Sequence, residues 1–309
     1  MKCLIINDMH PSIFQMMEDL SITVDYQPDL AQSKIAETIG KYDGLLVRGK
    51  KITKEIIDKA HHLKFIGRAG AGLDNIDIQA AEERGIQLFK APEGNRDAVA
   101  EHTVGLILNI LNKLRTADIE VRSFKWDREG NRGYELGGKT VGIIGYGYMG
   151  AAFSKRLIGF NCNVIAYDKY KKNYATKWTK EASLSELFEE TDILSIHVPL
   201  TSETHKMFDY SFFSKFKKNI IVINTARGEV LVLEDLLTAI KQGKVLGAGL
   251  DVLENEKLHA LNEQQQNTYN KLIANENVLL SPHVGGWSHE SHVRINQVLH
   301  DKIKKHFSL

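Results

Sequence analysis

Cysteine, proline and net charge are all scarce in this sequence, and each shortage excludes a class of protein. The 309 residues include only two cysteines and five prolines, and the formal net charge at pH 7 is +1. Cys3 and Cys162 are too few and too far apart for a disulfide framework or a cysteine-rich metal site, so we expect reduced thiols in a cytoplasmic protein. A charge so close to zero gives no overall attraction to nucleic acid or to an anionic membrane.

Long hydrophobic runs are also missing. No apolar stretch reaches the roughly 20 residues that a transmembrane helix needs. The apolar run at residues 3–6 is far too short for a signal peptide. Apolar residues still make up 43% of the chain, which is enough for a sizeable core. We therefore expect a soluble protein, and a chain of this length has room for two domains.

Short apolar segments alternate with helical patterns over residues 1–94. This alternation predicts a parallel sheet with crossover helices, in a small flavodoxin-like α/β domain. Helices are expected at 30–39 and at 54–60, the second capped by Thr53. The expected strands are 3–6, 22–25, 44–47, 65–66 and 86–88.

Two hinges divide the chain. Proline and glycine at 91–95 predict the first hinge, and a helical pattern follows from Asp97 to about Ser123. The apolar stripe of that helix is wide enough to predict burial on two sides, at a subunit interface. A second turn at 281–286 precedes a final amphipathic helix that ends near Phe307. We expect a domain of residues 1–94 and 285–309, a second domain of residues 95–284, and a cleft between the two.

The central feature of the sequence is a glycine turn after a buried strand, KTVGIIGYGYMG at 139–150. Gly145 permits the tight turn, Gly147 lets the backbone approach a pyrophosphate, and Gly150 lets the following helix pack on the strand. The N-terminus of that helix favours the phosphate charge. The next apolar run ends at Asp168, where a dinucleotide-binding fold places the carboxylate that binds ribose. The pattern predicts NAD, since this carboxylate repels a 2′-phosphate.

Further alternating elements complete a doubly wound sheet around this turn. Residues 257–271 match neither element type and are expected to form a surface excursion. The expected helices are 184–190, 211–216 and 233–242, and the expected strands are 193–198, 220–224, 246–250 and 278–280.

Three side chains able to do acid–base chemistry follow the last strands. Ligands bind at the carboxyl ends of parallel strands, where Arg227, Glu256 and His283 are expected. An arginine can bind a carboxylate and polarise an oxo group, and a histidine near neutral pKa can supply a proton. Each has a simpler interpretation: a structural ion pair for Arg227, a solvated surface group for Glu256 and a turn residue for His283. No His, Cys or carboxylate spacing indicates a metal site.

Seven motifs together resemble the D-isomer-specific 2-hydroxyacid dehydrogenases, over nearly the whole chain. Three residues depart from the family pattern: Lys257 replaces the usual proline, Gly49 replaces a hydroxyl residue, and Trp287 follows Gly286 where the family has Ser-Thr. The motifs are Val-Arg at 47–48, GRAGAGLDNID at 67–77, the glycine turn at 145–150, HVPL at 197–200, NTARG at 224–228, Asp251 with Glu256, and SPHVGG at 281–286.

The resemblance implies a set of functional residues. Arg227, Glu256 and His283 would be catalytic, with His283 as acid and base and Glu256 orienting it and raising its pKa. It also implies a homodimer formed through the nucleotide domain. The implied cofactor-binding residues are Gly145, Gly147, Tyr148, Met149, Gly150, Asp168, His197, Val198, Pro199, Thr225, Ala226, Asp251, Gly285 and Gly286.

The expected reaction is hydride transfer between NAD and C2 of a D-2-hydroxy acid. Backbone amides of Ala69, Gly70, Ala71 and Gly72 would bind the substrate carboxylate, and Arg227 and His283 would contact its C2 region. The cations Arg48 and Arg68 predict a distal phosphate, while Lys50 and Lys51 are as readily explained as solvated.

The GRAG stretch is most similar to family members that oxidise 3-phosphoglycerate to 3-phosphohydroxypyruvate at the entry to serine synthesis, in a form without their C-terminal regulatory domain. A glyoxylate, hydroxypyruvate or D-lactate type reductase is the alternative within enzymes. A dinucleotide-sensing corepressor or scaffold is the alternative outside them.

Overall fold

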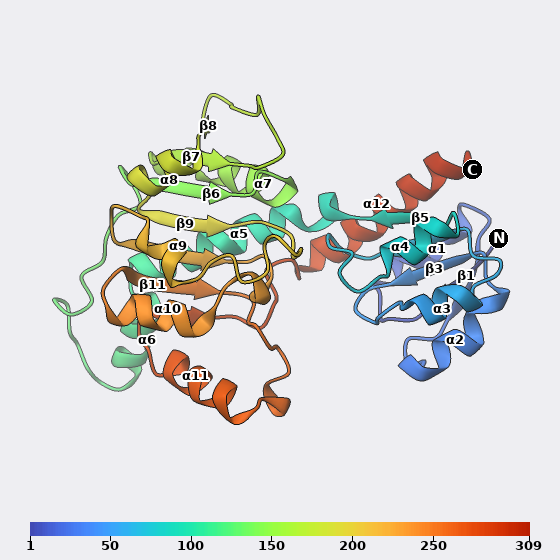
Figure 1. Cartoon of the computed structure of the whole chain (residues 1–309), viewed down its shortest axis with the longest axis horizontal. Helices are drawn as coiled ribbons and strands as arrows, with labels where there is room; N and C mark the ends of the chain where they lie inside the picture. The colour runs from blue at the N-terminus through green and yellow to red at the C-terminus, as the bar shows by residue number, and fades with distance from the viewer. The chain divides into compact units, whose positions relative to one another are not determined.

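The computed structural model describes all 309 residues, which divide into two compact units (Figure 1). The smaller unit consists of Met1–Arg96 with Trp287–Leu309, and the larger consists of Asp97–Gly286. Each unit is built on one sheet in which all paired strands are parallel. The prediction of two parallel-sheet α/β domains is confirmed.

The sheet of the smaller unit has the strand order β2-β1-β3-β4-β5, which is the flavodoxin-like order. Its strands are β1 (Lys2–Ile5), β2 (Thr23–Tyr26), β3 (Gly44–Val47), β4 (Phe65–Arg68) and β5 (Gln87–Lys90). Its main helices are α1 (Ser12–Glu18), α2 (Ile35–Thr38), α3 (Lys54–Lys59), α4 (Ile78–Glu83) and α12 (His289–Phe307).

Both faces of this sheet are buried because successive side chains of a strand point to opposite faces. In β1, Leu4 packs with the core under α2, α3 and α4, whereas Cys3 and Ile5 pack with the core under α1 and α12. The C-terminal helix α12 supplies Ile295, Leu299 and Ile303 to that second core. The smaller unit therefore needs both of its chain pieces to close its core.

Two helix predictions in this unit are corrected. The pattern at 30–39 does not form one helix: the short α2 lies between the 3₁₀ turns η1 (Gln32–Lys34) and η2 (Ile39–Lys41). Only Ile35 and Ile39 of this stretch are buried, so packing supports one turn and not three. Thr53 does occupy the N-cap of α3, but its side chain makes no capping hydrogen bond.

The expected hinge at 91–95 is helical. Helix α5 (Pro92–Leu111) begins at the proline, which is tolerated in a first helical turn, and continues past the boundary between the units. The helical pattern expected to run to Ser123 is interrupted instead at Lys113, whose backbone is left-handed with φ 51°. Helix α6 (Leu114–Arg122) follows this break and has no buried residue.

The larger unit contains the sheet β12-β11-β10-β9-β6-β7-β8. With β6 as the first strand, this is the doubly wound order of dinucleotide-binding domains with one further edge strand. The strands are β6 (Thr140–Ile144), β7 (Asn163–Tyr167), β8 (Lys180–Glu181), β9 (Ile193–Ile196), β10 (Ile220–Asn224), β11 (Val245–Leu250) and β12 (Val278–Leu280).

Helices cover both faces of this sheet. On one face α5 and α7 (Tyr148–Arg156) pack with Val141 and Ile143 of β6. On the other face Ile144 of β6 packs with a core that includes residues of α8 (Leu184–Glu190), α9 (Tyr210–Ser214), α10 (Leu233–Lys241) and α11 (Glu263–Ile273). Packing on both faces therefore fixes the positions of the carboxyl ends of the strands, which all lie at one edge of this parallel sheet.

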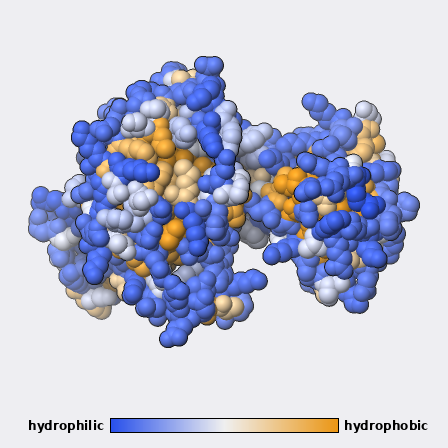
Figure 2. Space-filling view, in the orientation of Figure 1, coloured by the Kyte–Doolittle hydropathy of each residue, from blue (hydrophilic) through white to orange (hydrophobic).

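Helix α11 lies where a surface excursion was expected, so that prediction is wrong. Asn262 accepts a hydrogen bond from the Gln265 backbone, and the Gln265 side chain accepts one from the Asn262 backbone. This reciprocal cap starts the helix, and burial of Tyr269 and Leu272 in the core holds it. Polar side chains dominate the face shown in Figure 2, with apolar patches on both units. No helix combines the length and apolarity needed to cross a membrane.

Candidate active site

The glycine turn at the end of β6 has the geometry expected of a phosphate-binding loop. Gly145 has φ +93°, and a Cβ there would lie 2.5 Å from the His197 carbonyl oxygen. A Cβ at Gly150 would lie 2.1 Å from the Gly145 carbonyl oxygen. At Gly147 a Cβ would meet no atom within 4 Å, so the backbone there borders open space. Gly147 also caps α7 without a side-chain hydrogen bond, and Tyr148 and Met149 open that helix. The loop therefore fits a dinucleotide pyrophosphate.

Asp168 ties this turn to the end of β7. Its Oδ2 accepts a hydrogen bond from the Tyr146 backbone N–H at 2.8 Å, and its Oδ1 accepts from the Tyr170 and Lys171 backbone N–H groups at 2.9 Å each. Burial raises the pKa of the Asp168 carboxyl, but these backbone hydrogen bonds outweigh it and hold the pKa below its usual range. A carboxylate offers about four acceptor positions, so one remains for a ribose hydroxyl.

Lys171 reinforces the same connection. Its Nζ donates to the Tyr146 carbonyl oxygen at 3.0 Å, and the Tyr146 ring stacks on Tyr174 at 4.7 Å between centroids. The segment after β7 therefore holds the glycine turn through a carboxylate, an ammonium group and a ring. Neither Lys171 nor Tyr174 stands out in the sequence, because neither belongs to the glycine-turn motif at 145–150.

His197 follows β9 and is buried beneath the turn. Its Nε2 lies 2.8 Å from the Ser195 hydroxyl, and burial lowers the pKa of its imidazole to about 3. A ring that stays neutral cannot serve as the acid at neutral pH. His197 instead borders the cofactor loop through its backbone, because its carbonyl oxygen lies close to Gly145. Val198 and Pro199 continue the chain from this strand end.

Arg227 lies just beyond β10, in a turn shaped by a buried asparagine. Asn224 donates through Nδ2 to the Arg227 carbonyl oxygen at 2.9 Å and accepts from the Ala226 N–H at 3.0 Å. Thr225 lies between them and its hydroxyl is 3.2 Å from that of Thr103. A Cβ at Gly228 would lie 1.9 Å from the Leu253 carbonyl oxygen, so the turn also needs this glycine. Asn224 belongs to the NTARG motif, but no role for its side chain follows from the sequence.

Asp251, at the end of β11, organises the loop that carries His283. Its carboxylate accepts hydrogen bonds from the Ser281 hydroxyl at 2.6 Å and from the backbone N–H groups of Val284 and Gly285 at 2.9 and 2.8 Å. Burial raises the pKa of Asp251, but hydrogen bonds from His102, Ser281 and these two amides keep the pKa below its usual range. Asp251 is therefore an ionised acceptor at the centre of the loop, which continues to Gly286.

His283 and Glu256 are in direct contact. Nδ1 of His283 lies 3.0 Å from Oε2 and 2.9 Å from Oε1 of Glu256. An ionised carboxylate only accepts, so Nδ1 carries the proton and Nε2 is the ring nitrogen available for proton exchange. His283 has φ 54°, in the left-handed region, and its N–H donates to the Asp251 carbonyl oxygen at 2.8 Å. Because β10, β11 and β12 are adjacent and parallel, this pair and Arg227 lie at one edge of the sheet.

The predicted substrate residues of the smaller unit lie at the carboxyl ends of β3 and β4 and in the loop after β4. The guanidinium of Arg48 lies over the Trp287 ring, 3.3 Å from its centroid, and Nη2 lies 3.3 Å from Nε2 of His292. The Arg68 side chain lies against Gly70, within the loop of Ala69, Gly70, Ala71 and Gly72: a Cβ at Gly70, where φ is +147°, would lie 1.7 Å from Nη1 of Arg68.

Lys50 does not join this cationic group. Its Nζ donates to the Pro28 and Leu30 carbonyl oxygens at 2.7 Å each, and Lys51 is exposed. Of the four cations considered from sequence, the structure leaves Arg48 and Arg68 as the candidates for a substrate phosphate.

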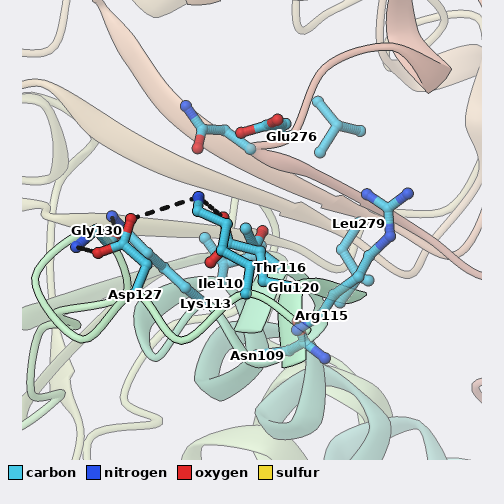
Figure 3. Close-up of a pocket in the computed structure, with 13 residues that line it drawn as sticks. Asn109, Ile110, Lys113, Arg115, Thr116, Glu120, Asp127, Gly130, Glu276 and Leu279 are labelled. Carbon is cyan, nitrogen blue, oxygen red and sulfur yellow. Dashed lines mark hydrogen bonds and ion pairs between the residues drawn. The ribbon is translucent and has the colours of Figure 1, made fainter. Parts of the chain in front are cut away.

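A cavity of about 210 Å³ lies elsewhere in the larger unit, away from the carboxyl ends of the strands (Figure 3). It is lined by residues of α5, α6, the following loop and the start of β12, including Lys113, Arg115, Glu120 and Glu276. Lys113 donates to the Gly130 carbonyl oxygen at 2.7 Å across it. Sequence motifs and strand topology, not cavity size, identify the candidate site. No group of three or more His, Cys, Asp or Glu side chains is placed to hold a metal ion.

Comparison with known proteins agrees with this geometry. Residues 104–285 match the family model of the D-isomer specific 2-hydroxyacid dehydrogenase NAD binding domain. The chain belongs to this family. It is similar to a hydroxypyruvate reductase of Thermotoga maritima, 36% identical over 94% of this chain and 92% of the relative. The NAD-binding fold and the cofactor predicted from the sequence are confirmed.

Two further similarities describe the range of the family. A D-3-phosphoglycerate dehydrogenase of Methanocaldococcus jannaschii is 35% identical over 98% of this chain, and the chain spans 57% of the length of that relative. The structure of a D-lactate dehydrogenase from Aquifex aeolicus, complexed with NAD and lactic acid, matches 100% of this chain and 96% of its own, with a TM-score of 0.84 and 27% identity. The family is thus shown, and the substrate within it is open.

Proposed function

We propose that the protein is an NAD-dependent oxidoreductase that interconverts 3-phosphoglycerate and 3-phosphohydroxypyruvate at the entry to serine synthesis. The observation that carries the proposal is the His283–Glu256 pair, at the strand edge that also bears Arg227. Bound NAD supplies a hydride acceptor at its nicotinamide C4, and NADH supplies the hydride. The two free cysteines support a cytoplasmic location.

The side chains divide the remaining work. His283 exchanges the proton of the substrate C2 oxygen through Nε2, while Glu256 accepts a hydrogen bond from Nδ1 and orients the ring. Arg227 binds the substrate carboxylate and polarises the C2 oxo group. The amides of residues 69–72 add hydrogen bonds to the same carboxylate. Asp251 keeps the loop of His283 in place through its three strong hydrogen bonds.

Arg48 and Arg68 support a phosphorylated substrate. The pKa of Arg48 is lowered to about 10, first by burial and then by the nearby Arg68 guanidinium. Two cations that destabilise each other in a partly buried place are both stabilised by a doubly negative group. The similarity to a D-3-phosphoglycerate dehydrogenase supports the same substrate.

A glyoxylate or hydroxypyruvate reductase is the second candidate, favoured by one observation. The hydroxypyruvate reductase relative is 36% identical over 94% of this chain, which is as similar as the D-3-phosphoglycerate dehydrogenase relative at 35% over 98%. The chemistry at C2 would be unchanged, and only the group beyond C2 would differ.

Initial rates of NADH oxidation test these candidates, with 3-phosphohydroxypyruvate beside hydroxypyruvate, glyoxylate and pyruvate. We expect kcat/KM to be about a hundredfold or more higher for the phosphorylated acid, which is roughly 2.7 kcal/mol of transition-state binding. Comparable values for the unphosphorylated acids would favour the second candidate. Binding of NADH without any turnover would indicate a dinucleotide sensor instead.

The proposed enzyme is a homodimer formed through the larger unit. Helix α6 and the loop after it expose several large apolar side chains, with Phe124 at 100% and Trp126 at 79% exposure. A row of this kind is unusual on the surface of a monomer and is typical of a protein interface. The others on this segment are Leu114, Ile119, Val121 and Tyr134.

A further inference from the structure

Two aromatic side chains from the C-terminal part of the smaller unit hold the Arg48 guanidinium. The Trp287 ring covers one face of it at 3.3 Å, and Nε2 of His292, in α12, lies 3.3 Å from Nη2. The two rings also meet each other, with centroids 4.7 Å apart at 70°. None of the motifs identified in the sequence includes His292.

The contact fixes the protonation of His292. Arginine has donors only, so Nε2 of His292 accepts the hydrogen bond and a neutral ring carries its proton on Nδ1. Burial lowers the pKa of His292, and the adjacent Arg48 charge lowers it further. A proton on Nε2 would remove the acceptor and place two cations in contact. Without a ligand, His292 is therefore neutral at neutral pH.

The surroundings of His292 are rich in basic side chains. Arg48 faces it from the end of β3, His10 from the β1–α1 loop and His289 from its own helix, and the Asp8 carboxylate also faces it. Arg68 adds a second guanidinium close to Arg48. Asp8, His10, Arg48, Ala69 and His292 line a shallow niche in this unit. A doubly negative group at the niche would reverse the local balance of charge.

We infer that His292 is a specificity-determining residue that takes up one proton when the dianionic distal group of the substrate binds beside Arg48. The anion takes the place of His292 as the acceptor of the hydrogen bond from Nη2 of Arg48. A proton from solvent then adds to Nε2 of His292. The protonated ring then donates to the anion as a second cationic arm. The inference rests on the proposed function, because it takes the distal group to be a phosphate.

Calorimetry with the NADH-loaded protein tests the proton uptake. 3-Phosphoglycerate and D-glycerate are each titrated at pH 7.5, where a phosphate monoester with its second pKa near 6 is mostly dianionic. Repeating the titration in two buffers of different ionisation enthalpy gives the number of protons bound. Because both ligands carry the same carboxylate and hydroxyl, any protonation of His283 cancels in their difference. We expect about one additional proton for 3-phosphoglycerate.

His292→Gln and His10→Gln are matched variants, since both histidines line the niche and glutamine keeps a neutral polar group. Between pH 7 and 8 the association constant of 3-phosphoglycerate, relative to D-glycerate, should fall about tenfold in the wild type. In His292→Gln the ratio of the two association constants should stay nearly constant between pH 7 and 8, and the additional proton should no longer be taken up. His10→Gln should behave as the wild type does, and thermal midpoints verify that both variants are folded.

Three outcomes overturn the inference. Equal proton uptake for the two ligands in the wild type would show that no group titrates with the phosphate. Uptake that persists in His292→Gln, or that disappears in His10→Gln, would assign the proton to another residue. In those cases a strong preference for the phosphorylated acid leaves the proposed function intact. No preference for 3-phosphoglycerate in the wild type would overturn both.

Discussion

The Ser281 hydroxyl donates a 2.6 Å hydrogen bond to Oδ1 of Asp251, from the loop after β12 to the end of β11. Nε2 of His102, in α5, lies 2.9 Å from the same hydroxyl. Three segments far apart in the chain are thereby connected two residues before His283. The position of the proposed acid depends on this carboxylate as much as on its own contact with Glu256.

Asp251→Asn should therefore reduce both stability and turnover. An amide has one acceptor oxygen, so one buried N–H of Val284 or Gly285 loses its partner, at a cost of about 1–3 kcal/mol. A displacement of the His283 loop by about 1 Å could cost about 10²-fold in kcat. Urea unfolding and initial rates measure the two effects. Ser281→Ala removes one hydrogen bond to Asp251. Its stability and turnover should lie between those of Asp251→Asn and the wild type.

Asp251 should also make the free energy of unfolding depend on pH. The folded-state pKa of Asp251 is below its usual range, so its contribution to stability is present above the ordinary carboxyl pKa. That contribution is lost as the pH falls through the lower, folded-state pKa. The difference in unfolding free energy between wild type and Asp251→Asn should shrink as the pH falls, in urea titrations from neutral to strongly acidic pH. A difference that does not change with pH would show that the charge of Asp251 is not what stabilises the loop.

His283→Ala should lower kcat by about 10²–10⁴-fold, the usual contribution of a general acid or base. Glu256→Gln keeps a hydrogen-bond acceptor for Nδ1 but removes the charge, so we expect a smaller loss. Fluorescence titration should show that both variants still bind NADH. Glu189→Gln, which removes a carboxylate paired with Lys217 on the surface, is the control and should retain full activity. Near-normal turnover in His283→Ala would exclude it as the acid.

Asp168→Ala should lower the preference for NADH over NADPH, because the carboxylate no longer repels a 2′-phosphate. It should also raise the KM for NADH, since the Tyr146 backbone loses its acceptor. Lys171→Met separates the two effects: it removes the hydrogen bond to the Tyr146 carbonyl oxygen but leaves the carboxylate. That variant should bind NADH less tightly with its cofactor preference unchanged. An unaltered ratio of kcat/KM values in Asp168→Ala would contradict the ribose role.

Trp126→Glu should convert the proposed dimer into monomers. The side chain is 79% exposed in the isolated chain, and a carboxylate in an apolar interface is costly to desolvate. Light scattering coupled to size-exclusion chromatography gives the mass directly. Ile273→Glu, a comparable apolar-to-charged change on α11 where the side chain is 59% exposed, should leave the mass unchanged. A wild-type monomer would refute the dimer before any variant is made.

Features that depend on short stretches of sequence were predicted well. Strands 44–47, 220–224 and 278–280 coincide with β3, β10 and β12 because each is an apolar run bounded by polar or glycine residues. The glycine turn was found because its backbone demands leave few alternatives to glycine. Helix α11 was missed although Asn262 and Gln265 have capping spacing, because few apolar residues follow them.

The contacts that connect the candidate site could not be predicted in the same way. Ser281 and Asp251 are 30 residues apart, and His102 and Ser281 are 179 apart. His292 belongs to no motif and Asn224 belongs to one without an assigned role, and the importance of both comes from what the fold places next to them. Long-range hydrogen bonds of this kind are set by tertiary structure, so sequence patterns reveal the residues near them and not the partners themselves.

The two-piece construction of the smaller unit has a consequence during synthesis. Ile295, Leu299 and Ile303 close a core whose other members precede residue 92. On the ribosome, one face of that sheet is covered by α1 but not by α12 until the C-terminal helix has emerged, whereas every residue of the larger unit has been made before then. Domains generally fold as they are completed, so the larger unit should fold first. The strands of the smaller unit, which are synthesised first, should then be the last to fold. Those waiting strands are where nascent chains would need the protection of a chaperone.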